Sequence, residues 1–480
     1  MGQTGVGRMK KEILRINDLN YTYTSTNRLE NISLCILEGE CVGFLGLTYS
    51  GKDLLVQLLD GNLEGGIDGA AVYIAGEKVS GSKYLREKVY RITADNYLID
   101  DWTVAEYIGL VDTGWLGMLL HGRQLAQEIG QYFESLGLKF DVSRKMRELT
   151  EAEKRIVDLV KALKRGAKLV IIEDEFEGMD SRDIALFADA MKRLIADRMA
   201  VVVNSHSNMI MHLLSDKYII FSKGRIVKKC SKSYIRDTEH LEQFLLSGGT
   251  IAGKTAAGRY VQEQAEDENI VYRVKGFVFQ KEQRRDFAFA KGKVASFLIL
   301  DGKEKERFFM ALSGRIPEED IEYVVDGRRY RSVSPDFLVR HKIVSVKSMG
   351  GQDEIFTKMS VEENLLLPSL YKISSLEYIS YAGGMARMAG ENMEKEETDQ
   401  TAMAGSLEIN DVISMTLERW YIYNPKVLIL FEPFILCDAY GVSIVKSYIK
   451  KFAARGTSVV IIKSREEYVE DISDEIINLR

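Results

Sequence analysis

Long hydrophobic runs are absent from this sequence. A run such as Val294–Leu300, which contains Ser296, is far shorter than the roughly 20 apolar residues that a membrane span needs. The opening segment, MGQTGVGRMKKEILRIND, has no apolar stretch after its basic residues, which argues against a secretory signal or a transit peptide. The sequence therefore predicts a protein that stays in the cytoplasm.

Cysteine is scarce, and a strong positive charge is missing. The cysteines, Cys35, Cys41, Cys230 and Cys437, form no CxxC or Cys/His pair, so we expect reduced, mostly buried thiols rather than disulfides or metal ligands. A net charge of -6 and an isoelectric point of about 5.7 argue against nucleic acid as the main partner.

What the chain does have is length and a balanced composition. Its 480 residues are 46% hydrophobic and 28% charged, which is typical of a folded, water-soluble protein. A single hydrophobic core stops growing at roughly 250–300 residues. Two or more domains are therefore expected.

An internal repeat divides the chain. Three segments of the first half return in the second half, in the same order and at separations of 253, 257 and 258 residues. Such a nearly constant separation indicates a duplicated domain. The pairs are Gly39–Gly46 with Gly292–Ile299, Trp102–Ile108 with Met359–Leu365, and Lys168–Glu175 with Lys426–Pro433.

Each copy alternates short apolar runs with longer periodic segments, a pattern typical of an α/β sheet domain. Val201–Asn204 and Ser458–Ile462 are expected to be late strands of the two copies. Polar and Gly-rich residues 231–270 predict a linker, which places the domains at 1–230 and 271–480. A Met- and Glu-rich stretch at 385–411 predicts a loop or helix inside the second copy.

A phosphate-loop pattern lies in the first copy. The segment GLTYSGKD matches G-x-x-x-x-G-K and misses the final Ser/Thr. Cys41–Leu45 before it predicts a buried strand and Leu54–Leu59 after it a helix, the setting that points backbone N–H groups and a helix N-terminus at phosphate. An ordinary Gly-rich turn is the alternative. The residues expected to bind nucleotide here are Gly46, Ser50, Gly51, Lys52 and Asp53.

Asp53 stands where the pattern has the hydroxyl that ligates Mg²⁺. Its carboxylate can still bind the metal through oxygen. It also brings a negative charge close to phosphate oxygens. We therefore expect weakened ATP affinity or a changed metal requirement.

The order of these motifs resembles that of the duplicated ATPase subunits of bacterial pentose and galactoside ABC importers. It runs through strand, phosphate loop, the WTVAEYI or MSVEENL block, the NPKVLILxEP block and a final Ser-His strand, and covers nearly the whole chain. The resemblance implies an α/β fold with two tandem P-loop NTPase (ABC ATPase) domains, each with a mixed sheet core and a helical subdomain.

The resemblance assigns further residues of the first copy. Tyr23 corresponds to the aromatic that stacks on adenine, with a surface strand tyrosine as the alternative. Glu173 and Asp174 stand where the family has Asp then Glu, so Glu173 would hold magnesium through water and Asp174 would be a shortened catalytic base. A helix cap is the alternative for both acids. His206 corresponds to the switch histidine, with a structural histidine as the alternative.

Other family positions of the first copy are changed. Ala94 replaces the glutamine between the subdomains, whereas Gly178–Asp180 retains the loop that communicates between the cassettes. The signature Leu-Ser-Gly-Gly-Gln corresponds to Leu149–Glu153, LTEAE, and in the second copy to Leu407–Asp411, LEIND. Both versions lose the glycines that let backbone approach the γ-phosphate.

The second copy departs further from the family. Its phosphate loop reads ILDGKEKE, in which Glu304 and Glu306 would oppose phosphate. Phe431 replaces the magnesium Asp, Glu432 survives as an isolated base, and Ser464 stands at the switch histidine. We expect this copy not to bind nucleotide.

The resemblance implies ATP and Mg²⁺ as cofactors, integral-membrane permease subunits as partners and, indirectly, a periplasmic or lipoprotein sugar-binding protein. The first hypothesis is an ATP-binding subunit of a sugar importer, peripheral on the inner face of the cell membrane, with weak or absent hydrolysis. The alternative is a non-catalytic paralogue acting as a nucleotide sensor, regulator or scaffold. A two-cassette translation factor is disfavoured because the linker is not a long basic arm that would reach RNA.

The two repeated blocks at 102–108 and 359–365 resemble the part of the family fold beside the groove for a permease helix. Ile108, Leu365, Leu366 and Leu367 could form the apolar floor that such docking needs. The alternative is that these residues are ordinary core.

Overall fold

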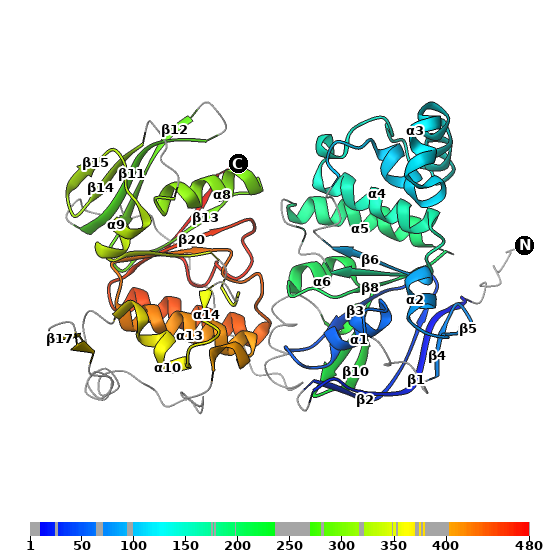
Figure 1. Cartoon of the computed structure of the whole chain (residues 1–480), viewed down its shortest axis with the longest axis horizontal. Helices are drawn as coiled ribbons and strands as arrows, with labels where there is room; N and C mark the ends of the chain where they lie inside the picture. The colour runs from blue at the N-terminus through cyan, green and yellow to red at the C-terminus, as the bar shows by residue number, and fades with distance from the viewer. Residues whose placement is uncertain are drawn as a thin grey trace, which may run out of the picture. The chain divides into compact units, whose positions relative to one another are not determined.

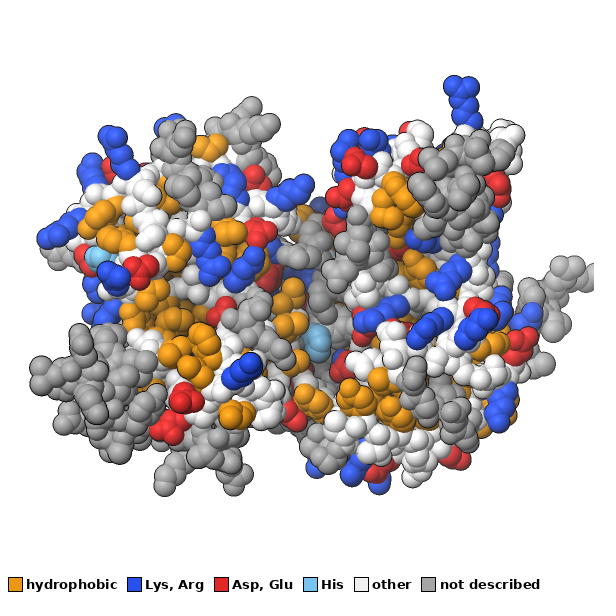
Figure 2. All heavy atoms as spheres, viewed as in Figure 1, with side chains coloured by type: hydrophobic (Ala, Val, Ile, Leu, Met, Phe, Trp, Pro, Cys, Tyr) orange, Lys and Arg blue, Asp and Glu red, His pale blue; other side chains and the backbone are white. Residues whose placement is uncertain are grey.

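The chain folds into two compact units, Met1–Ala252 and Gly253–Arg480 (Figure 1). The boundary between the units falls inside the predicted linker. On the face shown in Figure 2, Lys and Arg side chains are interspersed with Asp and Glu over both units. The computed structural model describes residues 10–24, 27–63, 71–93, 99–173, 176, 179–196, 198–235, 269–279, 283–315, 321–347, 349–351, 354–369, 374–375, 378–379 and 403–479.

Two sheets form the frame of the first unit. The four-stranded sheet is antiparallel, in the order β2-β1-β4-β5, and the six-stranded sheet has the order β10-β9-β3-β8-β7-β6. The latter is parallel except for β10, which pairs antiparallel with β9 at its edge. The strands are β1 (Glu12–Thr22), β2 (Arg28–Leu37), β3 (Cys41–Leu45), β4 (Ala71–Ile74), β5 (Glu77–Lys78), β6 (Val89–Thr93), β7 (Leu169–Glu173), β8 (Ala200–Val203), β9 (Lys217–Ser222) and β10 (Arg225–Ser231).

Helices cover both faces of the six-stranded sheet, which is why its central strands are apolar on both sides. On one face α1 packs between the two sheets. On the other face α3, α4, α5 and α6 form a second core. Burial on both faces makes strands such as β3 and β8 continuously hydrophobic, as the sequence predicts. The helices are α1 (Lys52–Leu59), α2 (Ser82–Lys88), α3 (Val104–Ser135), α4 (Glu151–Lys164), α5 (Ser181–Ile195) and α6 (Asn208–Leu214).

The second unit repeats this plan. Its antiparallel sheet has the order β12-β11-β14-β15 and its all-parallel sheet the order β16-β19-β20-β13-β21. The strands are β11 (Ile270–Phe279), β12 (Gln283–Ala290), β13 (Val294–Leu298), β14 (Glu322–Val325), β15 (Arg328–Tyr330), β16 (Ile343–Val346), β19 (Val427–Phe431), β20 (Ser458–Lys463) and β21 (Glu475–Asn478), with the small pair β17 (Ser374–Ser375) and β18 (Tyr378–Ile379). The helices are α8 (Gly302–Leu312), α9 (Pro335–Arg340), α10 (Val361–Leu366), α13 (Ile409–Tyr423) and α14 (Ala439–Ala454).

The repeated 102–108 and 359–365 blocks begin equivalent helices in the two units. Thr103 caps α3 and shares a capping box with Glu106, and Ser360 caps α10 with Glu363 in the same way. Each cap residue also forms an isolated antiparallel β-bridge with a residue distant in the sequence, Thr103 with Lys145 and Ser360 with Met403. The sequence echo therefore preserves the first turn of a helix, where two otherwise unpaired N–H groups are satisfied.

The described part of the first unit extends past residue 230, where the sequence analysis ends the domain. The strand β10 runs to Ser231, and Ile235 is fully buried in the core beneath α3 to α6. In the described part of the chain, no helix is long and apolar enough to cross a membrane.

A buried carboxylate ties three elements of the first unit together. Asp158 on α4 is fully buried, and its Oδ1 accepts hydrogen bonds from the hydroxyls of Tyr107 on α3 (2.7 Å) and Tyr90 on β6 (3.2 Å). The Lys161 ammonium lies 3.5 Å from the centre of the Tyr107 ring. Because a buried carboxylate needs donors, these hydroxyls fix the packing of α3 and α4 against the sheet.

Tyr107→Phe removes the shorter of the two donors to Asp158. We expect the free energy of unfolding of the first unit to fall by about 1–3 kcal/mol, the cost of an unsatisfied buried polar group. Calorimetric melting of the full chain measures this loss. Tyr23→Phe, at an exposed tyrosine, is the control; equal melting of both variants would show that the Asp158 network does not hold the unit together.

Candidate functional site

The phosphate-loop segment of the first unit lies where the sequence places it, between β3 and α1 at the carboxyl edge of the parallel strands. Gly51 caps α1 with a φ of 101°, a left-handed conformation that a side chain rarely adopts. A Cβ on Gly46 would lie 2.3 Å from Ser50 Oγ and 2.8 Å from the Phe221 carbonyl oxygen. Both glycines are therefore required by the local backbone and its close packing.

A buried hydroxyl of the loop is available to a ligand. Among the described residues, Ser50 Oγ has no hydrogen-bond partner, although Ser50 is only 4% exposed. Lys52 is also buried, at 3% exposed, and stands at the first position of α1. A hydroxyl without a partner beside a buried ammonium and a helix N-terminus is suited to an anionic oxygen.

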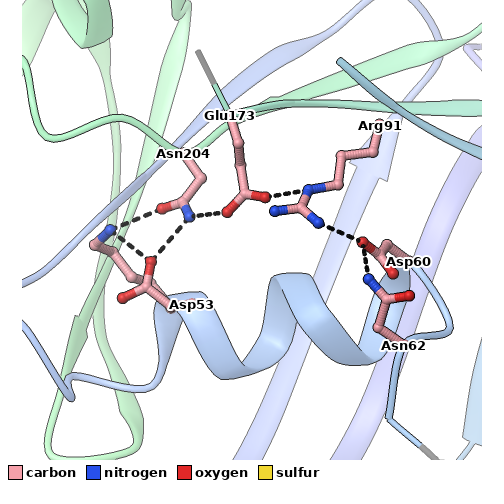
Figure 3. A network of polar contacts seen from close by, with 7 residues as sticks. Asp53, Asp60, Asn62, Arg91, Glu173 and Asn204 are labelled. Atoms are coloured by element: carbon pink, nitrogen blue, oxygen red, sulfur yellow. Dashed lines mark hydrogen bonds and ion pairs between the residues drawn. The ribbon is translucent and has the colours of Figure 1, made fainter. Parts of the chain in front are cut away.

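Lys52 belongs to a hydrogen-bond network of four side chains. Figure 3 labels the other three, Asp53, Asn204 and Glu173. Its Nζ donates to Asp53 Oδ1 at 2.9 Å and to Asn204 Oδ1 at 2.8 Å. Asn204 Nδ2 in turn donates to Asp53 Oδ1 and to Glu173 Oε1, each at 2.9 Å. The amide of Asn204 thus bridges the two carboxylates that the sequence assigns to magnesium.

Arg91 continues this network away from the loop (Figure 3). Its guanidinium pairs with Glu173 Oε2 and, at 3.3 Å, with Asp60 Oδ2. Asp60 Oδ2 also accepts from Asn62 Nδ2 at 2.8 Å. Because Asp60 follows the last residue of α1, the network connects both ends of this helix to β6 and β7.

The pKa values of Asp53 and Asp60 are shifted in opposite directions. Burial raises the pKa of Asp53, but the Lys52 ammonium and the hydrogen bonds from Asn204 and Lys52 outweigh it and leave the pKa lowered, helped by His206. For Asp60, burial raises the pKa and prevails over the nearby Arg91. Asp53 is therefore held as an anion that competes with phosphate for Lys52.

The other sequence-assigned residues of the first copy lie in different surroundings. His206 follows β8 closely enough for its charge to lower the pKa of Asp53. Tyr23 lies just after β1 and is 58% exposed, with its N–H bonded to the Asn27 carbonyl. Asp180 caps α5, whereas Asp174, Ala94 and Gly178 lie outside the described residues.

Two residues of the network, Asn204 and Arg91, do not appear among the sequence-assigned site residues. Asn204 is the polar residue that ends the apolar strand β8, directly before Ser205 and His206, and this position was the available signal. Arg91 is the single charge within β6, VYRIT, where it points away from the core. The sequence positions of Asn204 and Arg91 do not indicate their hydrogen-bond partners, because those partners belong to other elements of the fold.

The segment at the signature position, Leu149–Glu153, contains the start of helix α4. Thr150 caps α4 in a capping box with Glu153, whose carboxylate also accepts from Arg144 at 2.7 Å. Glu151 pairs with Arg155 at 2.6 Å. Glu151, which replaces a signature glycine, is therefore engaged in an ion pair, and Glu153, at the signature glutamine, in capping and an ion pair.

The second unit has no phosphate loop at the equivalent place. Its helix α8 begins at Gly302, three residues before Lys305, whereas α1 begins at Lys52 itself. Asp301 caps this extra turn by accepting from the Glu304 N–H at 2.9 Å. Gly302–Glu304, which correspond to Tyr49–Gly51 of the loop in the first unit, are helical here. Glu304 pairs with Arg307 and Glu306 with Lys347, so both acids are held by neighbouring cations.

Lys305 lies in the interior of the second unit. It is fully buried, and its Nζ donates to Glu432 Oε1 at 2.5 Å and to Ser464 Oγ at 2.7 Å. Glu432 Oε1 also accepts from the Ser464 N–H and hydroxyl, at 2.8 and 2.9 Å. Burial raises the pKa of Glu432, but Lys305 and Lys463 outweigh it and leave that pKa lowered. The Lys305 ammonium is thus engaged by partners within the unit.

The apolar residues proposed for a docking floor lie in the protein interior. Ile108 is fully buried, and Leu365 and Leu366 are 6% and 2% exposed. Ile108 belongs to the core beneath α3 to α6, and Leu365 to a small core shared with α13. The docking-floor hypothesis is therefore wrong for these three residues, which belong to the core. Leu367, the fourth residue of that hypothesis, is half-buried.

Comparison with known proteins supports the duplication and the fold. A model of the ABC transporter family matches residues 29–176. The ribose import ATP-binding protein of Rhizobium meliloti is 24% identical over 98% of this chain and 93% of its own length. The xylose import ATP-binding protein of Geobacillus kaustophilus is 22% identical over 98% of this chain and 94% of its own.

The chain has the fold of two tandem P-loop NTPase domains of the ABC ATPase type. It resembles the ATP-binding proteins of sugar import along both domains. Among solved structures, the RNase-L Inhibitor matches 96% of the chain with a TM-score of 0.55 and 17% identity. At this identity the likeness concerns the fold alone.

Lys305→Met tests whether the buried pair of the second domain is structural. We expect the free energy of unfolding to fall by about 3–5 kcal/mol, because Glu432 keeps its charge in a buried place without its main partner. The double variant Lys305→Met/Glu432→Leu should recover most of this loss. Calorimetric melting measures both, with Lys303→Met at an exposed neighbour as control. A double variant no more stable than the single one would contradict the pairing.

Proposed function

We propose that this protein is the ATP-binding subunit of an ABC-type sugar import system, with nucleotide bound in the first domain and weak or absent hydrolysis. The phosphate loop of the first domain carries the proposal. Its two constrained glycines, the buried Lys52 and the unpartnered Ser50 hydroxyl suit the phosphates of a nucleotide.

The breadth of the sequence similarity supports the import role. The ribose and xylose import ATP-binding proteins align with both domains and with almost their full lengths. A protein that had kept only a nucleotide-binding module would share one domain with them. The partners proposed on this basis are integral-membrane permease subunits, with a sugar-binding protein acting through them. The protein would then lie in the cytoplasm against the inner face of the cell membrane.

The contacts of Glu173 support weak hydrolysis. One of its oxygens accepts from Asn204 and the other pairs with Arg91, so this carboxylate is already occupied on both sides. Asp53 repels the phosphate oxygens that Lys52 attracts. Nucleotide binding is therefore weakened, and both oxygens of Glu173, the carboxylate assigned to magnesium, are engaged by internal donors.

A second candidate is a non-catalytic paralogue that acts as a nucleotide sensor, regulator or scaffold. The Lys305–Glu432–Ser464 network favours it, because a site sealed by an internal ion pair contributes structure rather than turnover. This candidate shares the proposed nucleotide site in the first domain. It differs from the first in requiring no permease.

Lys52→Ala should abolish nucleotide binding, because it removes the buried cation of the phosphate loop. Lys305→Ala should leave binding unchanged, since its ammonium is committed to Glu432. Titration calorimetry with ATP and ADP, each with magnesium and with a chelator, measures both. The expected stoichiometry is one nucleotide per chain. Two equivalent sites, or binding that survives Lys52→Ala, would overturn the assignment.

The two candidate functions differ in membrane attachment. For the import subunit, the protein should sediment with membranes from cells that express a permease encoded beside it, and remain unattached in cells without that permease. Turnover of the purified chain should fall well below the ~1–10³ s⁻¹ typical of enzymes. A chain that stays unattached in the presence of the permease would favour the regulatory role instead.

A further inference from the structure

Two internal donors stand where a divalent cation is expected in the first domain. Asp53 and Glu173 are the carboxylates that the sequence assigns to magnesium, and Asn204 Nδ2 lies between them, 2.9 Å from an oxygen of each. An ionised carboxylate can only accept hydrogen bonds. The face of the Asn204 amide that meets both acids must therefore be its NH₂ group, which carries the two hydrogens that these acceptors need.

The opposite face of the same amide confirms this orientation. Asn204 Oδ1 accepts from Lys52 Nζ at 2.8 Å, a bond that only an oxygen can make with an ammonium. Lys52 also donates to Asp53, so the side chains of Lys52, Asp53 and Asn204 are hydrogen-bonded to one another. A metal ion shared by Asp53 and Glu173 would have to displace the amide from both.

Arg91 secures the other side of Glu173. Its guanidinium pairs with Glu173 Oε2 and is itself fixed by Asp60, which is 8% exposed in its side chain. Asp60 is held in turn by Asn62. Arg91 is thus held at two points, by Glu173 and by Asp60 (Figure 3).

The charge and composition of this cluster fit magnesium poorly. Lys52 and Arg91 already offset two of the three carboxylates, Asp53, Glu173 and Asp60. Magnesium demands near-octahedral oxygen coordination, and the hydroxyl that supplies one ligand in the phosphate-loop pattern is missing here. In the described part of the chain, no three His, Cys, Asp or Glu side chains gather into a metal-binding group.

We propose that Asn204 and Arg91 take the place of the divalent cation, so that the first domain binds nucleotide without magnesium. This inference rests on the proposed nucleotide binding of that domain. Phosphate oxygens would meet the loop N–H groups, Ser50 and Lys52. Asn204 and Arg91 would keep Asp53 and Glu173 satisfied beside them.

The decisive experiment compares nucleotide binding by the wild-type chain with and without divalent metal. Fluorescent ADP is titrated into the full-length protein in excess MgCl₂ and in excess EDTA. We expect dissociation constants that agree within about threefold, a difference of less than 1 kcal/mol. Mn²⁺ added without nucleotide and followed by electron paramagnetic resonance should show no site in the wild-type chain.

Arg91→Gln and Asn204→Ala test the two stand-in groups separately. Each leaves carboxylate oxygens without their internal donor, so magnesium should now improve nucleotide affinity by about tenfold, or 1.4 kcal/mol, and a Mn²⁺ signal should appear. Arg147→Gln is the matched control, because Arg147 is 54% exposed and pairs with Asp101 away from the loop. It should behave as the wild type does.

The outcomes separate this inference from the proposed function. Wild-type binding that requires magnesium would overturn the inference and leave nucleotide binding in place. Absence of binding under both conditions would overturn nucleotide binding itself, and this inference with it. If neither variant becomes dependent on magnesium while both melt as the wild type does, Asn204 and Arg91 do not replace the cation. Should one variant fail to fold, the wild-type comparison and the other variant still decide.

Discussion

A buried lysine near the start of the first helix is the constraint on which the centre of each domain depends. Lys52 and Lys305 occupy equivalent positions after β3 and β13, and both ammonium groups are removed from water. A buried charge is tolerated only when it is paired and hydrogen-bonded. Each domain therefore supplies an anion to its lysine, and the two domains do so differently.

In the first domain the anion is a neighbour in the chain. Asp53 shares Lys52 with Asn204, and the loop before them ends at Gly51, which holds a left-handed conformation. In the second domain the anion comes from a distant strand end, Glu432, and the loop has become a helical turn capped by Asp301. The same architecture thus carries a loop suited to phosphate in one copy and a closed ion pair in the other.

The contrast explains how a duplicated protein keeps its shape while its sites diverge. The repeated helix caps at Thr103 and Ser360 preserve the subdomain that follows each phosphate-loop region. The parallel strands keep their order in both copies. Packing and capping depend on local patterns and on apolar burial, so they survive changes that alter the polar groups at the carboxyl edge of the sheet.

The sequence by itself determined the duplication, the strand–loop–helix setting of Gly46 to Lys52 and the late strands. These follow from short-range patterns and from the internal repeat. Only the tertiary structure decided what those side chains contact. Asn204 and Arg91 contact residues that lie 31 to 152 positions away in the sequence, and such pairings leave no periodic signal. The burial of Ile108 and Leu365 was likewise decided by packing, because an apolar residue in a sequence is equally compatible with a core and with a docking groove.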